Sequence, residues 1–166
     1  MKESISTLNS IKEILIKHNI WLSVAESLTC GKLQSSFGEI SGISKCFRGG
    51  ITAYTIDEKV NLLKIKREEA KEVNCVSENI AWQMAKGVSE MFHSEIGIGT
   101  TGYAEKSNIG GEPHCYFAIY MKKNNSESEI IIKQRIDGGK RNRIEFQKFI
   151  VETILNELLT VLEKKL

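Results

Sequence analysis

Three residues of this sequence have the types and spacing for nucleophilic chemistry without a metal: Ser27, Tyr54 and Lys59. Ser27 follows an apolar run at 20–25 that predicts a buried strand, and it precedes a helical pattern at 28–37. A hydroxyl at a strand-to-helix turn lies beside backbone N–H groups and the positive end of a helix dipole, which can stabilise an oxyanion. The alternative is that Ser27 only caps the helix, which is the commoner role of serine there.

A serine nucleophile needs a base, and Lys59 is the candidate. It lies in a predicted short helix at 55–63, directly after a predicted strand at 47–54. Burial lowers the pKa of a lysine towards neutrality, so that the amine can accept a proton. Tyr54 ends the strand, and its hydroxyl could relay or orient that proton. The alternative is that Lys59 is a solvated lysine and Tyr54 a half-buried strand residue.

Other nucleophiles, bases and metal ligands are less well placed. His18, His93 and His114 fall away from the predicted strand-to-helix turns, which argues against a Ser-His-Asp triad and against a histidine metal site. Cys30 and Cys115 are rival nucleophiles. Cys115 is next to His114, a possible base, but neighbouring residues of a strand point to opposite faces. No two cysteines are spaced as CxxC, so a zinc or redox motif has no support.

Two further segments carry groups that bind polar ligands. One is a predicted strand-to-loop turn: Thr101-Gly102-Tyr103. Its backbone N–H groups or its threonine hydroxyl can bind a phosphate or a carboxamide. The other holds three basic residues that open the predicted last helix: Lys140, Arg141 and Arg143. They suit a phosphate. For each segment the alternative is a solvated surface.

Predicted helices and strands alternate in the first part of the chain, and two predicted strands pair as a hairpin in the last part. Hydrophobic periodicity predicts helices near residues 5–19, 28–37, 55–63, 66–73, 77–92 and 140–162. It predicts strands at 20–25, 47–54, 95–100, 114–121 and 128–136, the last two joined by a turn at 124–126. This order favours the α/β class, with a mixed β-sheet covered by helices on both faces.

Length and composition bound the class of protein. The 166 residues are enough for one domain with its own core, and no linker or repeat divides residues 1–166. A net charge of +2 gives no argument for binding to nucleic acid or to a membrane. No apolar run approaches the roughly 20 residues of a membrane span. The first residues do not resemble a signal peptide, so we expect a cytoplasmic protein with free thiols.

The segment around Ser27, Ala25-Glu26-Ser27-Leu28-Thr29-Cys30-Gly31, resembles the AES-x-TGG signature of the CinA C-terminal family. That family includes the bacterial nicotinamide-nucleotide amidohydrolases. Four further segments are similar to family motifs and follow in family order: Gly49 to Tyr54 with Lys59, Val76-Ser77-Glu78, Thr101-Gly102-Tyr103-Ala104, and Gly138 with the basic helix start. The resemblance runs from about residue 5 to residue 160, which is nearly the whole chain.

The resemblance implies a three-layer α/β/α sandwich and a serine–lysine reaction without a metal or other cofactor. The reaction would hydrolyse the carboxamide of nicotinamide mononucleotide to nicotinate mononucleotide and ammonia. Ser27 would attack the amide carbon, Lys59 would take its proton with Tyr54 in the relay, and N–H groups at the start of the 28–37 helix would hold the oxyanion. Substrate positioning would fall to Thr29, Gly31, Thr101, Gly102, Lys140, Arg141 and Arg143.

The resemblance also implies that the protein is a homo-oligomer and that its ligand is a small-molecule nucleotide. Four family segments differ here: the first glycine of TGG is Cys30, a Gly-Pro is replaced by Glu105-Lys106, a Gly-Thr is replaced by His114-Cys115-Tyr116, and a G-D-R segment reads Gly138-Gly139-Lys140. A carboxylate at Glu105 in a phosphate-binding loop would repel a substrate phosphate. The alternatives are therefore a catalytically impaired nucleotide-binding or regulatory domain of the same fold, or a hydrolase of the same fold acting on another amide.

Overall fold

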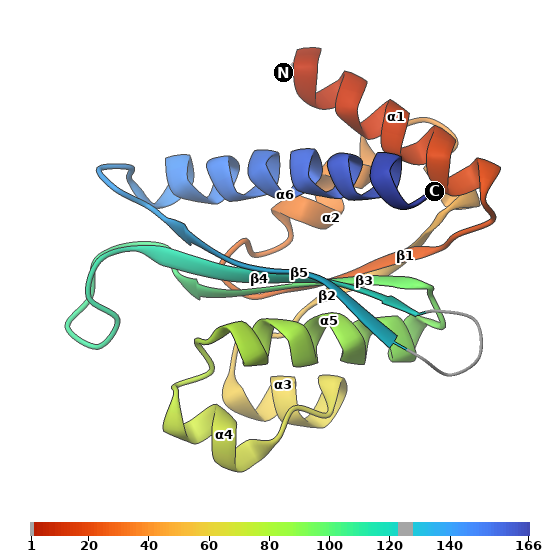
Figure 1. The fold of residues 1–166 in the computed structure, drawn as a ribbon. Helices are drawn as coiled ribbons and strands as arrows, with labels where there is room; N and C mark the ends of the chain where they lie inside the picture. The colour runs from red at the N-terminus through yellow and green to blue at the C-terminus, as the bar shows by residue number, and fades with distance from the viewer. Residues whose placement is uncertain (1, 123–127) are drawn as a thin grey trace.

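A five-stranded mixed sheet forms the middle layer of the fold, and helices cover both of its faces (Figure 1). The computed structural model describes residues 2–122 and 128–166. The elements in chain order are α1 (Lys2–Lys17), β1 (Leu22–Glu26), α2 (Lys32–Gly38), the 3₁₀ helix η1 (Ile43–Lys45), β2 (Phe47–Thr52), α3 (Ile56–Leu63), α4 (Arg67–Glu72), α5 (Glu78–Phe92), β3 (Ile96–Tyr103), β4 (His114–Lys122), β5 (Ser128–Asp137) and α6 (Arg143–Lys165).

The strand order β2-β1-β3-β4-β5 combines two kinds of pairing. β1 pairs in parallel with both β2 and β3, whereas β4 pairs antiparallel with β3 and β5. The carboxyl ends of parallel strands meet at one edge of a sheet, where α/β proteins bind their ligands. The residues that follow β1 and β2, which include Ser27 and Tyr54, therefore come together at this edge.

Each face of the sheet has its own helical cover. In Figure 1, α1, α2 and α6 lie on one side of the sheet, and α3, α4 and α5 lie on the other. The first side holds the larger core, in which Phe37, Phe117 and Phe146 are fully buried. The second side packs Ile80 and Met84 of α5 against Leu63 of α3. The predicted three-layer α/β/α sandwich with a mixed sheet is confirmed.

Helix α5 lies unusually close to β3 because β3 carries glycines where the helix crosses it. A Cβ atom on Gly97 would lie 1.9 Å from the backbone oxygen of Ala85, and one on Gly99 would lie 2.2 Å from that of Ala81. Interiors packed at this density leave no space for a side chain. The glycines of β3 thus set the distance between the sheet and the helix that supports the α3 layer.

Several predicted boundaries are wrong. The helix predicted at 28–37 begins only at Lys32, and the strand predicted at 47–54 ends at Thr52. Thr101-Gly102-Tyr103 is not a turn, because β3 continues to Tyr103 and pairs with β4 as far as His114. The last helix begins at Arg143 and not at residue 140, because Asn142 is its N-cap and its side chain accepts from the backbone N–H groups of the first turn. The predicted turn at 124–126 lies outside the described residues.

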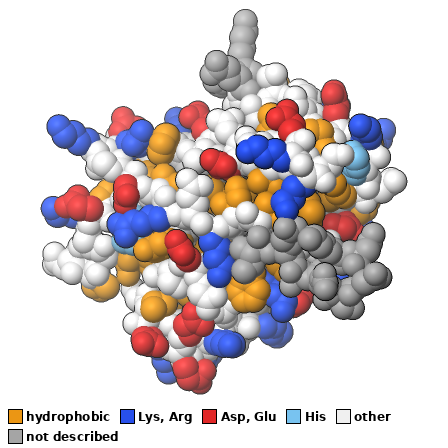
Figure 2. Space-filling model, viewed as in Figure 1, with side chains coloured by type: hydrophobic (Ala, Val, Ile, Leu, Met, Phe, Trp, Pro, Cys, Tyr) orange, Lys and Arg blue, Asp and Glu red, His pale blue; other side chains and the backbone are white. Residues whose placement is uncertain are grey.

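Three large hydrophobic residues that continue the periodicity of their helices are exposed: Ile5, Met91 and Ile144. Each lies in the first or last turns of its helix, where the helical periodicity continues beyond the layer beneath it. On the face shown in Figure 2, charged side chains of both signs are interspersed, and hydrophobic side chains gather between the upper helices and the sheet. Within the described ranges, every helix is too short or too polar to cross a membrane.

The close approach of α5 to β3 predicts that Gly97→Ala lowers the free energy of unfolding by about 1–3 kcal/mol, because backbone must move to admit the methyl group. Gly38→Ala is the matched control, since nothing lies within 4 Å of its added Cβ. Urea unfolding of both variants measures the difference. Equal stability of the two variants would contradict the proposed packing constraint.

Candidate active site

Ser27 and Lys59 lie side by side at the carboxyl ends of the parallel strands. The Lys59 Nζ atom lies 3.0 Å from Ser27 Oγ and 3.1 Å from the backbone oxygen of Tyr54. Both side chains are buried, with 2% of Lys59 and 6% of Ser27 exposed. Lys59 reaches this position from the first turns of α3, a helix whose start is capped by the Thr55 side chain. The pairing of nucleophile and base therefore comes from two separate elements.

The environment of Lys59 favours its uncharged form. Burial lowers the pKa of the amine, and the nearby thiol of Cys75 opposes that shift only in part. Neither oxygen that contacts Nζ carries a negative charge, since one belongs to a hydroxyl and the other to a peptide group. A buried lysine without an acidic partner is desolvated and loses its proton more easily. The buried amine is therefore a better proton acceptor than a solvated lysine.

The interpretation of Ser27 as a helix cap is wrong. The N-cap of α2 is Gly31, and no side chain caps it in the usual way. The carboxylate of Glu26, the last residue of β1, accepts instead from the N–H groups of Gly31, Leu33 and Gln34 at 3.0, 3.1 and 2.8 Å. These donors are occupied, so the start of α2 cannot hold an oxyanion in this arrangement.

The turn between β1 and α2 is held by polar contacts on both sides. Thr100 Oγ1 accepts from the Ser27 N–H at 3.4 Å and lies 2.9 Å from Thr29 Oγ1. From α6, the Gln147 side chain donates to the Leu28 carbonyl at 2.6 Å. Among the described residues, the backbone N–H groups of Leu28 and Thr29 donate to no protein acceptor. Leu28 also lines the pocket beside Ser27, whereas Thr29 is fully buried.

A pocket of about 320 Å³ opens onto the pair, and its far wall is a strained corner of the chain. Asn74 and Cys75 both have positive φ angles, 48° and 59°, which non-glycine residues rarely adopt. The Thr101 hydroxyl donates to the Cys75 carbonyl at 2.6 Å, and the Asn74 amide donates to the Tyr103 hydroxyl at 2.7 Å. These bonds attach the corner to β3 and hold it facing Ser27.

Tyr54 contacts the pair through its backbone and not through its hydroxyl. Its carbonyl accepts from Lys59, whereas its hydroxyl accepts from Arg143 Nη2 at 3.0 Å. The side chain is about half exposed and lines the mouth of the pocket. The predicted relay through the hydroxyl therefore has no contact with Lys59 in this arrangement.

The predicted ligand-binding residues separate into two groups. Thr101 and Gly102 line the pocket, and Arg143 reaches its rim through Tyr54. The others lie elsewhere or are engaged: Thr29 is buried against Thr100, Gly31 binds Glu26, Lys140 is exposed ahead of α6, and Arg141 lies 3.7 Å from the Phe149 ring centre. Cys30 is exposed with a φ of 50°, so the backbone there adopts a conformation that favours glycine.

Of the two rival nucleophiles, Cys115 is out of reach of a ligand. Cys115 is fully buried, and burial strongly raises the pKa of its thiol. The His114 ring packs 5.6 Å from the Tyr103 ring, which separates it from the pocket, and its Nδ1 lies 2.9 Å from the Glu112 carbonyl. No group of three or more potential metal-ligating acids, histidines and cysteines is found in the described part of the chain.

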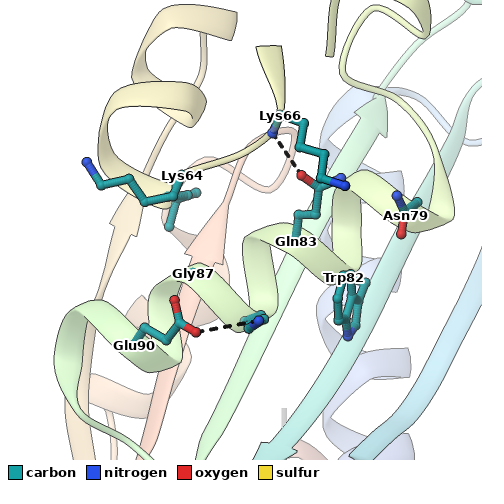
Figure 3. Close-up of a pocket in the computed structure, with 9 residues that line it drawn as sticks. Lys64, Lys66, Asn79, Trp82, Gln83, Gly87 and Glu90 are labelled. Carbon is teal, nitrogen blue, oxygen red and sulfur yellow. Dashed lines mark hydrogen bonds and ion pairs between the residues drawn. The ribbon is translucent and has the colours of Figure 1, made fainter. Parts of the chain in front are cut away.

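A second pocket, of about 420 Å³, lies on the outer face of α5 (Figure 3). Its polar groups are largely satisfied by one another: the Gln83 side chain accepts from the Lys66 N–H at 2.9 Å, and Lys86 pairs with Glu90 at 3.7 Å. Its lining contains no serine, threonine, cysteine or histidine. It therefore offers no hydroxyl or thiol nucleophile, and the candidate chemistry stays with Ser27.

The site also depends on residues that the sequence analysis did not single out: Glu26, Asn74, Cys75, Thr100 and Gln147. Glu26 left a local signal, because an acidic residue a few positions before a helix suits the positive end of the helix dipole. The others act through contacts between distant segments, for which the sequence contains no local pattern.

Fold and site together define an α/β/α sandwich with a buried serine–lysine pair at the carboxyl ends of its parallel strands. The family model of the CinA C-terminal domain matches residues 5–162, and the chain belongs to that family.

Two relatives and two solved structures agree with this assignment. A relative from Clostridioides difficile (strain 630), whose name refers to competence-damage induction, is 35% identical over 94% of this chain and 36% of its own length. A CinA-like protein of Prochlorococcus marinus (strain MIT 9515) is 34% identical over 98% of this chain and 38% of its own length. The chain thus spans less than two fifths of either relative.

The structural similarity shows the fold alone. The competence damage-inducible protein A from Klebsiella pneumoniae subsp. pneumoniae MGH 78578 superposes with a TM-score of 0.87 at 20% identity, over 98% of this chain and 99% of its own. A CinA superfamily protein from Enterobacter cloacae gives a TM-score of 0.85 at 22% identity, over 96% and 92%.

The role of Glu26 predicts that Glu26→Ala lowers the free energy of unfolding by about 1–3 kcal/mol, because three N–H groups lose their acceptor. Glu26→Gln should lose less, since it keeps one acceptor oxygen. Glu39→Ala, at the exposed other end of α2, should stay within about 0.5 kcal/mol of the wild type. Urea unfolding compares the three, and a Glu26→Ala variant as stable as Glu39→Ala would refute the capping role.

Proposed function

We propose that this chain is a nicotinamide-nucleotide amidohydrolase, which converts nicotinamide mononucleotide to nicotinate mononucleotide and ammonia. The observation that carries the proposal is the 3.0 Å contact between Ser27 Oγ and the buried Lys59 Nζ at the base of a pocket. Family membership, established by the match over residues 5–162, supports the choice of substrate. The proposed reaction is amide hydrolysis through a covalent acyl-enzyme.

In the first half-reaction, Ser27 Oγ attacks the carboxamide carbon while its proton passes to the neutral amine of Lys59. The carbonyl oxygen becomes an oxyanion, and the N–H group of Leu28, a residue of the pocket lining, is suited to donate to it. Lys59 then returns the proton to the departing nitrogen. The C–N bond breaks, ammonia leaves, and the nicotinoyl group remains as an ester on Ser27.

In the second half-reaction, water replaces ammonia. Lys59 takes a proton from the water, whose oxygen attacks the ester carbon, and the second tetrahedral intermediate collapses by breaking the bond to Oγ. Lys59 returns the proton to Oγ, and the carboxylic acid product loses its remaining acidic proton to solvent and leaves as a carboxylate. The uncharged form of the amine is required in both halves, and this requirement explains why burial without an acidic partner is useful.

Assaying ammonia release from nicotinamide mononucleotide tests the reaction. Ser27→Ala and Lys59→Met should each lower kcat/KM at least about 10³-fold, because each removes one member of a unit that acts together. Ser35→Ala on α2 and Lys64→Met at the end of α3 are matched exposed controls, and they should keep activity. Equal rates for the wild type and both site variants would remove the assignment.

The lowered pKa of Lys59 sets the expected pH dependence. Activity needs the neutral amine, so it should be present above the pKa of Lys59 and fall as the pH drops through it. The midpoint of this rising limb in kcat/KM should lie below the ordinary range for lysine, and initial rates across neutral and alkaline pH measure it. A limb centred on the ordinary lysine value would show that the amine is not desolvated during turnover.

The same assay separates the alternative functions. Binding of the nucleotide by calorimetry without release of ammonia would indicate an impaired or regulatory binding domain. Turnover of other carboxamides, but not of the nucleotide, would indicate a hydrolase of different specificity. The homo-oligomer and the cytoplasmic location stay predictions, which light scattering and cell fractionation can test.

A further inference from the structure

Arg143 is a cation at the rim of the Ser27 pocket. It is the first residue of α6, and its Nη2 donates to the hydroxyl of Tyr54, whose side chain lines the pocket mouth. The guanidinium of arginine binds anionic oxygens in pairs, which makes it suited to a phosphate or a carboxylate. A ligand that fills the pocket and carries an anionic group beyond its mouth could therefore contact this side chain.

The guanidinium of Arg143 already forms an ion pair with a carboxylate of this chain. Glu105 Oε1 accepts from Arg143 Nη1 at 2.6 Å. Glu105 lies two residues beyond Tyr103, a residue of the pocket wall, so the ion pair links the end of β3 to the start of α6 beside the pocket. An anionic ligand that binds Arg143 through Nη1 must first displace this carboxylate.

The ion pair is built weakly enough to be displaced. The Arg143 and Glu105 side chains are 42% and 62% exposed, and solvent-exposed pairs of this kind contribute little. Even a weak competitor changes specificity, because it opposes an anionic ligand and leaves a neutral one unaffected. The direct repulsion expected for Glu105 from the sequence thus becomes competition for one cation.

We propose that Glu105 is a specificity-determining residue that competes with the phosphate of the substrate for Arg143. The substrate class named here rests on the proposed function. Glu105 lowers the affinity of the pocket for the phosphorylated nucleotide relative to the corresponding nucleoside, and the rim selects by charge while the Ser27–Lys59 pair performs the chemistry. The contact also explains why Arg143 is held in place when no substrate occupies the pocket.

The matched control lies on the same loop. Glu112 pairs with Lys106, both side chains are well exposed, and neither residue lines the pocket. Glu112→Gln therefore removes the same charge from the same segment without freeing Arg143. Glu105→Gln keeps the size of the side chain and removes only its charge, so loss of folding is not expected from an exposed position.

Titration calorimetry with two products, nicotinate mononucleotide and nicotinate riboside, isolates the effect, because the two ligands differ only by the phosphate. Glu105→Gln should bind the mononucleotide about 2- to 5-fold more tightly than the wild type and bind the riboside equally well. Glu112→Gln should match the wild type for both ligands. In an Arg143→Ala background, Glu105→Gln should lose its advantage, which is the coupling expected of competition for one cation.

Several outcomes would overturn the inference: no gain for the mononucleotide, an equal gain for the riboside, an equal gain in Glu112→Gln, a gain that survives in Arg143→Ala, or no mononucleotide binding to any variant. Binding does not require catalysis, so the two proposals fail separately. A tighter Glu105→Gln complex without ammonia release would leave this inference standing and remove the amidohydrolase. Ammonia release with unchanged Glu105→Gln binding would do the reverse.

Discussion

The burial of one lysine amine, with no carboxylate beside it, is the constraint on which the rest of the site depends. In the part of the chain that the structure describes, Lys59 Nζ donates hydrogen bonds to two uncharged oxygens, on Ser27 and on the backbone of Tyr54. Placing an amine there requires α3 to close over the ends of β1 and β2. Helix α5 lies on the same side of the sheet as α3 and packs closely against it, because a Cβ on Gly87 of α5 would lie 2.3 Å from the Leu63 carbonyl of α3.

The charged groups around this amine are each satisfied by a partner of their own. Glu26, fully buried next to Ser27, gives its carboxylate to the N–H groups that start α2. Arg143 at the rim is paired with Glu105. Because these charges are engaged elsewhere, neither carboxylate supplies the counter-charge that would keep Lys59 protonated. In the proposed function, Arg143 and Glu105 at the pocket rim select the charge of the ligand, and Lys59 inside the pocket transfers the proton.

The fold was largely predictable from hydrophobic periodicity, and the errors have local causes. Thr101-Gly102-Tyr103 contains a glycine and polar groups typical of a turn, yet antiparallel pairing with β4 keeps it in the strand. Gly102 there has a φ of 153°, and a Cβ on it would lie 2.2 Å from the His114 carbonyl. The glycine that suggested a turn instead permits the close pairing of two strands.

The sequence by itself determined which elements form, the mixed sheet class and the residue types at the strand-to-helix turns, because periodicity and turn signals are local properties of the chain. It also pointed to Ser27 and Lys59 as a pair. Only the tertiary structure decided that these side chains, 32 residues apart, lie in contact, that Glu26 and not Ser27 caps α2, and that Arg143 alone of the three basic residues reaches the Tyr54 hydroxyl. Such contacts depend on the register between strands and the packing of helices over them, which no stretch of sequence encodes alone.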